Sequence, residues 1–324
     1  MKELRNQSTG TGGYAALKEG AALVEHRHRK LLGLSGKDPS GLLAAILSNE
    51  IPTREDLGVY GLLLDAKGRV QTDLRILKQG SGDLIAEVEP EGVEAAREIL
   101  GRYAPFSRVQ LQDLSGEGWS TLGLYGPGAK DALAELLGEP PDLEEHQTME
   151  TSLPNSETPL LVAGVRRPVE GYDLIGPSET LDAIRESLTS NGAVPADATA
   201  YEAARIEAGV PRFGADLTPD NFPAEANVLD RAVSFSKGCY PGQETVARMH
   251  YRGHPNRTLY RLSVQGSTEA GASITQNGRE VGCLTSLSPL GDGNALGYLH
   301  RKADPGGELR AGEASISILG PAGE

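Results

Sequence analysis

The sequence predicts an α+β protein that ends in a small β-barrel, and two observations support this fold class. Up to about residue 254, short apolar strands and amphipathic helices follow one another along the chain. Beyond that point only short alternating strands follow, and Asn277-Gly278 is typical of a tight hairpin. We therefore predict a helix-containing region over residues 1–254 and a β-barrel over residues 255–324.

The expected elements of the first region can be placed in order. Residues 1–13 are polar and rich in Gly, Ser and Thr, so we expect them to be mobile. Asp38 can cap the first well-defined helix, and Pro39 suits its first position. The other expected elements are a strand, turn and helix in 20–51, two strands around Lys67-Gly68 in 59–79, a strand in 83–89, a helix in 89–103, a strand in 107–114 and a helix from 198 to Gly209.

Three segments share a rhythm of strand, turn and helix: residues 34–48, 124–138 and 174–190. The last two carry a Gly-Pro pair before the helix, which favours the turn. They could be equivalent units of a repeated α+β layer, or the similarity could be chance. Residues 139–158 are acidic and contain prolines, so we expect a loop there.

Composition limits the classes of function. The net charge of −14 argues against broad, non-specific nucleic-acid binding, although a local basic patch remains compatible with it. Two cysteines, Cys239 and Cys283, make neither a disulfide framework nor a zinc motif, so we predict no metal site and a reducing compartment. The N-terminus has no signal-peptide core, and no stretch approaches ~20 apolar residues. We therefore expect a cytoplasmic protein.

Cys239 lies in the stretch SKGCYPGQETVARMHYRGHPNR, directly before a Pro-Gly turn. A reactive thiol needs some exposure and nearby positive charge, which Lys237 could supply. Gln243 and Glu244 add hydrogen-bonding groups. The residues alone are equally compatible with a working thiol and with a small packed side chain.

A basic run follows this turn, in a chain that is otherwise acidic. It could bind a phosphate, a polyglutamate tail or an acidic partner, or it could be a linker that pairs with the acidic body of the protein. Its members are Arg248, His250, Arg252, His254 and Arg257.

Two earlier segments carry candidate binding residues. Glu207 precedes a glycine turn and could accept two parallel N–H groups from a pterin or guanine edge, while Tyr201 could supply a flat stacking face. The alternative is a solvated helix residue and a core tyrosine. In the strand GRVQTDLRIL, Asp73 and Arg75 share a face. They are an exposed ion pair unless that face lines a cavity.

The motif KGCYPGQE, Lys237 to Glu244, resembles the signature of the YgfZ family of folate-binding and tRNA-modifying proteins, relatives of the glycine cleavage T-protein. Other segments with the same resemblance are GLSGKD, LLLDAKGRVQTDL, ARIEAGVPRFGADL, FPAEA and VGCLTSLS. The resemblance implies a three-domain ring with a ferredoxin-like piece, in which two interleaved α+β domains precede the barrel and folate binds in a central cavity.

The resemblance also implies roles for individual residues. Glu207 and Tyr201 would hold the pterin, and Asp73 would lie near the reacting nitrogens of the folate. Lys237 and Cys239 match the positions taken as essential in YgfZ-type proteins. We further expect folate contacts from three residues of the same stretch, namely Tyr240, Gln243 and Arg248.

One departure concerns the T-protein itself. Its Asp-Asp-Leu stretch reads Thr72-Asp73-Leu74 here, so only one of the two aspartates is present. The cysteine motif is not a T-protein feature, so aminomethyl transfer from a lipoyl carrier is not expected.

The preferred function is therefore a protein that binds tetrahydrofolate or a one-carbon-substituted folate and supports the maturation or repair of Fe–S enzymes. Its expected partners are Fe–S client proteins, including tRNA-thiolating enzymes, with no membrane and no direct tRNA binding. A folate-dependent one-carbon transferase that uses Asp73 is the alternative. A third hypothesis is a docking module whose basic run recruits an acidic protein or tRNA.

Overall fold

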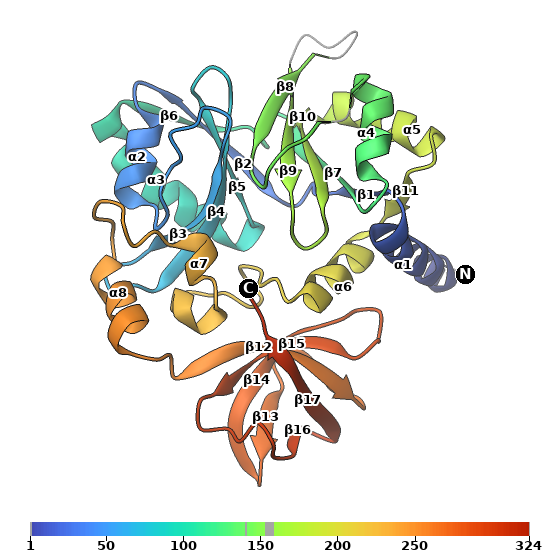
Figure 1. Cartoon of the computed structure of the whole chain (residues 1–324), viewed down its shortest axis with the longest axis vertical. Helices are drawn as coiled ribbons and strands as arrows, with labels where there is room; N and C mark the ends of the chain where they lie inside the picture. Colours follow the sequence, from blue (N-terminus) through green and yellow to red (C-terminus); the bar gives the residue numbers. More distant parts are fainter. Residues whose placement is uncertain (1, 140, 153–158, 324) are drawn as a thin grey trace.

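Two open β-sheets and a closed barrel carry the chain and form the three lobes seen in Figure 1. The computed structural model describes residues 2–139, 141–152 and 159–323. The α+β class with a C-terminal barrel is confirmed. The first barrel strand begins at Arg257, close to the boundary predicted between residues 254 and 255.

The first sheet is antiparallel and is covered on one face by two helices. In its strand β4, Leu74 and Ile76 pack under these helices, whereas Asp73 and Arg75 face the opposite side. As predicted, Asp38 caps the first helix by accepting a hydrogen bond from the Gly41 N–H, at 2.8 Å. In spatial order the strands are β3 (Val59–Leu64), β4 (Val70–Lys78), β5 (Leu84–Val88), β2 (Lys30–Gly36) and β6 (Val109–Asp113), and the helical segments are α2 (Pro39–Ile46), η1 (Pro90–Gly92) and α3 (Val93–Ser107).

The second sheet takes its strands from both sides of the first sheet in the sequence, so the two are interleaved. Helices α4 and α5 cover its outer face, and helices α1 and α6 pack against β1 and β11. In spatial order the strands are β11 (Val194–Ala196), β1 (Ala22–Glu25), β7 (Trp119–Tyr125), β10 (Gly171–Pro177), β9 (Leu160–Val165) and β8 (Thr148–Thr151), and the helices are α1 (Lys2–Glu19), α4 (Ala129–Leu137), α5 (Ser178–Ser190) and α6 (Ala198–Ala208).

The inner faces of the two sheets meet, and this arrangement creates the site described below. An apolar cluster joins them, with Leu31, Leu77 and Ile85 from the first sheet and Leu161 and Ile175 from the second. Neighbouring positions on the same inner faces are charged rather than apolar, so the contact between the sheets gives way to a polar cavity.

Two expectations for irregular segments were wrong. Residues 2–13 belong to α1 rather than to a mobile tail. Near the end of this segment Gly13 packs closely on β11, since a Cβ atom there would lie 2.7 Å from the Cα of Ala196. The expected acidic loop contains strand β8, although residues 140 and 153–158 of that loop lie outside the described residues.

The segment between α6 and the barrel is more helical than expected. The predicted turn is present, since Gly242 has φ 81°, and a helix follows it that carries Arg248, His250 and Arg252 of the basic run. The Asn277-Gly278 hairpin is confirmed, with φ values of 52° and 74°. These elements are η2 (Pro223–Ala226), α7 (Leu229–Ala232), α8 (Gln243–Arg252) and, around the barrel, β12 (Arg257–Gln265), β15 (Asn294–His300), β14 (Arg279–Leu287), β13 (Ser273–Gln276), β16 (Leu309–Ala311) and β17 (Ala314–Pro321).

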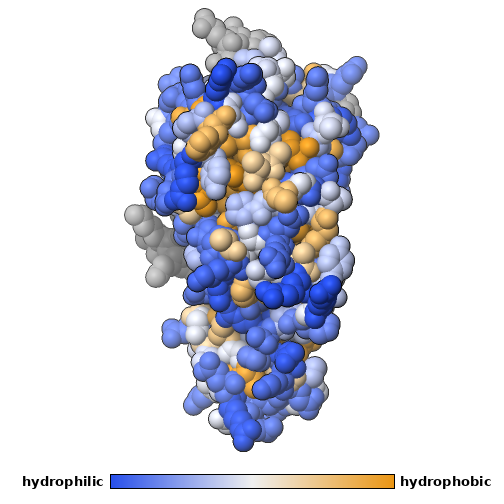
Figure 2. Space-filling view, turned by 90° about the vertical axis from the view of Figure 1, so that its left-hand side faces the viewer, coloured by the Kyte–Doolittle hydropathy of each residue, from blue (hydrophilic) through white to orange (hydrophobic). Residues whose placement is uncertain are grey.

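The surface is mainly hydrophilic on the face shown in Figure 2, where hydrophobic side chains gather in the upper lobe. Within the described ranges, no helix is both long and apolar enough to cross a membrane.

Candidate functional site

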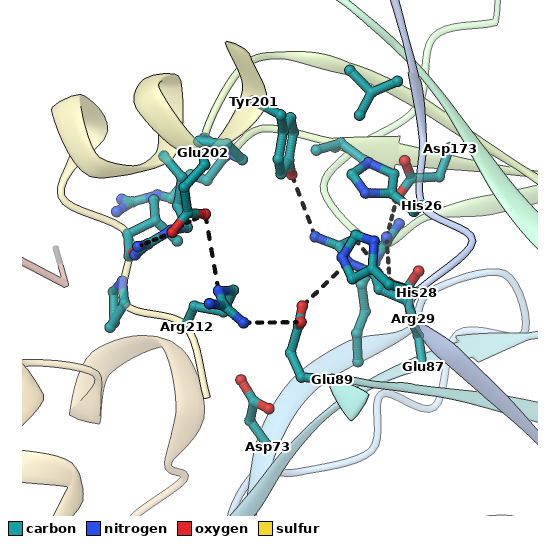
Figure 3. A pocket seen from close by; sticks show the side chains of 18 of the residues that line it. His26, His28, Arg29, Asp73, Glu87, Glu89, Asp173, Tyr201, Glu202 and Arg212 are labelled. Atoms are coloured by element: carbon teal, nitrogen blue, oxygen red, sulfur yellow. Dashed lines mark hydrogen bonds and ion pairs between the residues drawn. The ribbon is translucent and has the colours of Figure 1, made fainter. Parts of the chain in front are cut away.

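A cavity of about 650 Å³ lies where the two sheets, α6 and the loop that follows α6 come together (Figure 3). Its wall is rich in ionisable groups of both signs, with a few apolar side chains such as Val88 and Val165. The strand face that carries Asp73 and Arg75 lines this cavity, which is the condition under which the sequence favours a ligand role for Asp73.

Asp73 is buried in the cavity wall and lies below Glu89 in the view of Figure 3. The Tyr60 hydroxyl donates a hydrogen bond to Asp73 Oδ2, at 2.9 Å. Burial, followed by the negative charge of Glu89, raises the pKa of Asp73 from 3.8 to about 6. The carboxyl group can therefore take up or release a proton close to neutral pH.

A chain of hydrogen bonds crosses from the first sheet to the second. Arg75 Nη1 donates to Glu87 Oε2, at 3.1 Å, and to Asp173. Asp173 also accepts a hydrogen bond from the Tyr125 hydroxyl, whose oxygen lies 2.8 Å from Nε2 of His26. These partners fix the buried side chains on this wall of the cavity.

Tyr201, from α6, forms part of another wall. Its ring packs edge-on against His26, with centroids 4.7 Å apart, and lies 5.5 Å from the Tyr125 ring. Arg29 Nη2 donates to the Tyr201 hydroxyl at 3.4 Å, and Arg29 Nε lies 3.3 Å from Glu89. Tyr201 thus lines the cavity.

Glu202, the next residue along α6, points into the same space (Figure 3), whereas Glu207 does not line it. Arg205 donates two hydrogen bonds to the Glu202 carboxylate, at 2.9 and 2.7 Å. Burial alone would raise the pKa of Glu202, but the hydrogen bonds and charge of Arg205, with Arg212 beyond it, lower the pKa. Sequence reasoning missed Glu202. The helical period could have indicated it, because positions 201, 202 and 205 lie on one side of a helix.

Glu207 is engaged elsewhere. It accepts hydrogen bonds from the Tyr14 hydroxyl and from Lys18 Nζ, both at 2.6 Å. These partners belong to α1, so Glu207 ties α1 to α6. The structure therefore does not bring Glu207 together with Tyr201 and Asp73 in the cavity.

The KGCYPGQE stretch also lies outside the lining of this cavity. Cys239 is an exposed free thiol. Lys237 Nζ donates to the carbonyl oxygens of Ala44 and Leu47, at 2.9 and 2.5 Å, so it caps the end of α2, and partial burial lowers its pKa. Tyr240 is buried in an apolar cluster, and burial raises its pKa to about 12.

Gln243 and Arg248 belong to α8, where Gln243 is the first residue and Arg248 is exposed. Neither side chain lines the cavity. The structure thus separates the residues expected at the folate into three places: Asp73 and Tyr201 line the cavity, Glu207 lies between α1 and α6, and the five residues between Lys237 and Arg248 lie outside the cavity.

Several polar atoms in the cavity wall are buried and have no hydrogen-bond partner among the described residues. Glu89 Oε2 is an acceptor, Nε and Nη2 of Arg75 and Nε of Arg29 are donors, and Nδ1 of His26 and of His146 accepts or donates according to the tautomer. Unpaired buried polar groups are unfavourable, so a ligand with both donors and acceptors would be stabilised here. In the part of the chain that the structure describes, no group of three or more His, Cys, Asp or Glu side chains is placed to hold a metal.

Comparisons with known proteins agree with this fold. The family model of the GCVT N-terminal domain matches residues 8–237 and so ends before Cys239. Proteins named tRNA-modifying protein YgfZ from Yersinia pestis and Yersinia pseudotuberculosis are 30% identical over 278 residues, covering 81% of this chain and 79% of theirs. The crystal structure of the glycine cleavage aminomethyltransferase T from Bartonella henselae superposes with a TM-score of 0.81, at 22% identity, covering 95% of this chain and 88% of that one. The predicted T-protein-like fold is confirmed.

Proposed function

Because the chain belongs to the family of the GCVT N-terminal domain, with the YgfZ proteins among its relatives, we propose that its cavity binds tetrahydrofolate or a one-carbon-substituted folate. We further propose that the folate-bound protein supports Fe–S enzymes, including those that modify tRNA. The observation that carries the folate proposal is the set of unpaired buried donors and acceptors around a 650 Å³ cavity.

The chemistry of a pterin suits this cavity. A pterin is flat and presents amino and ring N–H donors beside an oxo acceptor, and Tyr201 offers an aromatic surface to it. Glu202 and Glu89 can accept the N–H groups, and the free Nε and Nη2 of Arg75 can donate to the oxo group. In this proposal Glu202 takes the role that the sequence suggested for Glu207.

Asp73 would lie near the reacting nitrogens of the folate. With a pKa of about 6, its carboxyl group can donate a proton to an amine nitrogen of the folate, and can take that proton back from the resulting ammonium group, without a large free-energy cost near neutral pH. The Tyr60 hydroxyl orients this carboxyl group.

Cys239 would act at the surface rather than inside the cavity. Its exposure makes the thiol available to a protein partner, and Lys237 would serve mainly to hold the turn on α2. This part of the proposal is tested in a deletion strain assayed for Fe–S enzyme activity and complemented by wild type or Cys239→Ala. Full complementation by Cys239→Ala would refute a role for the thiol.

Folate binding is tested by anaerobic calorimetry with tetrahydrofolate. Glu202→Gln should weaken binding about tenfold or more, because it removes a charged acceptor from the cavity. Glu207→Gln, on the same helix but outside the cavity, is the matched control and should bind like wild type. The proposal fails if wild type does not bind, or if only the Glu207 variant is weakened.

A folate-dependent one-carbon transferase is a second candidate, favoured by the raised pKa of Asp73 in the cavity. Purified protein should then turn over a methylene donor with a suitable acceptor. Activity that persists in Cys239→Ala and disappears in Asp73→Asn would support the transferase, and no turnover with any acceptor class would argue against it.

A further inference from the structure

His26 follows strand β1 and forms part of the cavity wall beside Tyr201 (Figure 3). It is only 1% exposed, and its ring is held edge-on against Tyr201. Its backbone N–H also donates to Thr121 O at 2.9 Å, so the residue has little freedom to move.

The hydrogen bonds around Tyr125 determine which nitrogen of His26 carries a hydrogen. The single Tyr125 hydroxyl hydrogen is donated to Asp173 Oδ1, while Oδ2 of the same carboxyl group forms an ion pair with the Arg75 guanidinium. The Tyr125 oxygen lies 2.8 Å from His26 Nε2, so Nε2–H must be the donor in that contact. Nε2 is protonated for this reason.

The ring is also uncharged. Burial, followed by the positive charge of Arg29, holds the pKa of His26 well below 6.5. Since Nε2 carries the only hydrogen, Nδ1 is a bare acceptor. It is buried and has no hydrogen-bond partner within the described ranges.

We propose that His26 Nδ1 accepts a hydrogen bond from the N5–H or N8–H group of the bound pterin and so makes the cavity selective for reduced pterins. This inference rests on the proposed folate function and adds a residue that distinguishes oxidation states. In a tetrahydropterin, N5 and N8 carry hydrogens, whereas in the fully oxidised ring they are lone-pair acceptors. An oxidised pterin would therefore place a lone pair against the fixed lone pair of Nδ1, and the pair would be unfavourable.

Tyr125 is the positioning residue in this arrangement. It does not line the cavity, but its contacts with Asp173 and His26 fix the tautomer. Without the Tyr125 hydroxyl, Nδ1 could carry the hydrogen and donate to an oxidised ring instead.

The test compares the affinities for tetrahydrofolate and folic acid, measured anaerobically by calorimetry. Wild type should favour tetrahydrofolate by about tenfold or more. His26→Gln keeps a donor near the Nε2 position but lacks the Nδ1 acceptor, so the preference should disappear. His26→Asn puts an amide oxygen near the Nδ1 position and should retain part of it. Tyr125→Phe should reduce the preference while leaving the His26 side chain in place.

A spectroscopic measurement on wild type covers the case in which these variants misfold. In ¹⁵N-histidine-labelled protein, His26 should show a protonated Nε2 and a bare Nδ1, and the Nδ1 resonance should shift when tetrahydrofolate is added. An Nδ1–H tautomer, an imidazolium, or equal affinity for both folates would overturn this inference alone. If wild type binds neither folate, the proposed function fails and this inference fails with it.

Discussion

Replacing Asp73 by Asn should stabilise the folded protein at neutral pH. Burial deprives the Asp73 carboxylate of water, which makes its charged form unfavourable in the folded state. The pKa of Asp73 is raised from 3.8 to about 6, and at about 1.4 kcal/mol per pKa unit this shift corresponds to about 3 kcal/mol. The folded state binds the proton more tightly than the unfolded state does. The stability that protonated Asp73 contributes is therefore complete below pH 3.8 and is lost as the pH rises through about 6. Asparagine has no such loss and still offers an oxygen to the Tyr60 hydroxyl.

The measurement is urea denaturation of wild type and Asp73→Asn between pH 4 and 8, followed by the fluorescence of Trp119, the only tryptophan of the chain. Trp119 packs against the apolar cluster that joins the two sheets, so it reports on the region around the cavity. The variant should equal wild type at pH 4 and exceed it by up to about 3 kcal/mol at pH 7.5.

The matched control is Asp142→Asn, since the Asp142 side chain is 96% exposed and its change should have an effect below about 0.5 kcal/mol at every pH. Equal stability of Asp73→Asn and wild type at pH 7.5, or a difference that does not vary with pH, would refute the reasoning.

Three further predictions follow from other contacts. Lys237→Met removes two hydrogen bonds to the end of α2 and should lower the free energy of unfolding by about 1–3 kcal/mol; unchanged urea denaturation would contradict this structural role. Arg205→Met leaves the buried Asp216 carboxylate without its 2.6 Å ion pair and should lower the free energy of unfolding by about 3–5 kcal/mol. Adding Asp216→Asn should recover part of this loss, and no recovery would argue against the ion pair as its cause. Cys239 should react quickly with a maleimide and Cys283 slowly, because Cys239 is exposed and burial raises the pKa of Cys283. Saturating tetrahydrofolate should not slow the reaction of Cys239, and a slower reaction would place that thiol in the cavity.

Much of the fold could be predicted because local rules decide it. Asp38 before Pro39, and Asn277 before Gly278, specify a helix start and a hairpin through their own backbone and side-chain geometry. The helix over residues 2–13 could not be predicted in this way. The reason that Gly13 belongs there is the proximity of Ala196, which is distant in the sequence.

The candidate site could be predicted only where local patterns determine it. Asp73 was placed correctly on one face of its strand by the period of two, but only the packing of the second sheet turns that face into a cavity wall. The resemblance pointed to Glu207, whereas the helical period places Glu202 on the same side of α6 as Tyr201 and Arg205, so the period rather than the motif carries the information on which glutamate faces inward. The positions of Cys239 and Lys237 depend on the contact between their turn and α2, which is specified by no local pattern.

The barrel is connected to the cavity through three consecutive polar contacts. Ser286, in β14, donates to Asp216 at 2.8 Å; Asp216 pairs with Arg205, and Arg205 holds Glu202. If the attachment of the barrel helps to hold Glu202 in place, and if the cavity binds folate as proposed, thermodynamic reciprocity requires that folate binding and barrel attachment strengthen each other by the same free energy. A protein partner that stabilises the joint between the barrel and the cavity would then raise the folate affinity without contacting the folate, and folate would raise the affinity for that partner by an equal factor.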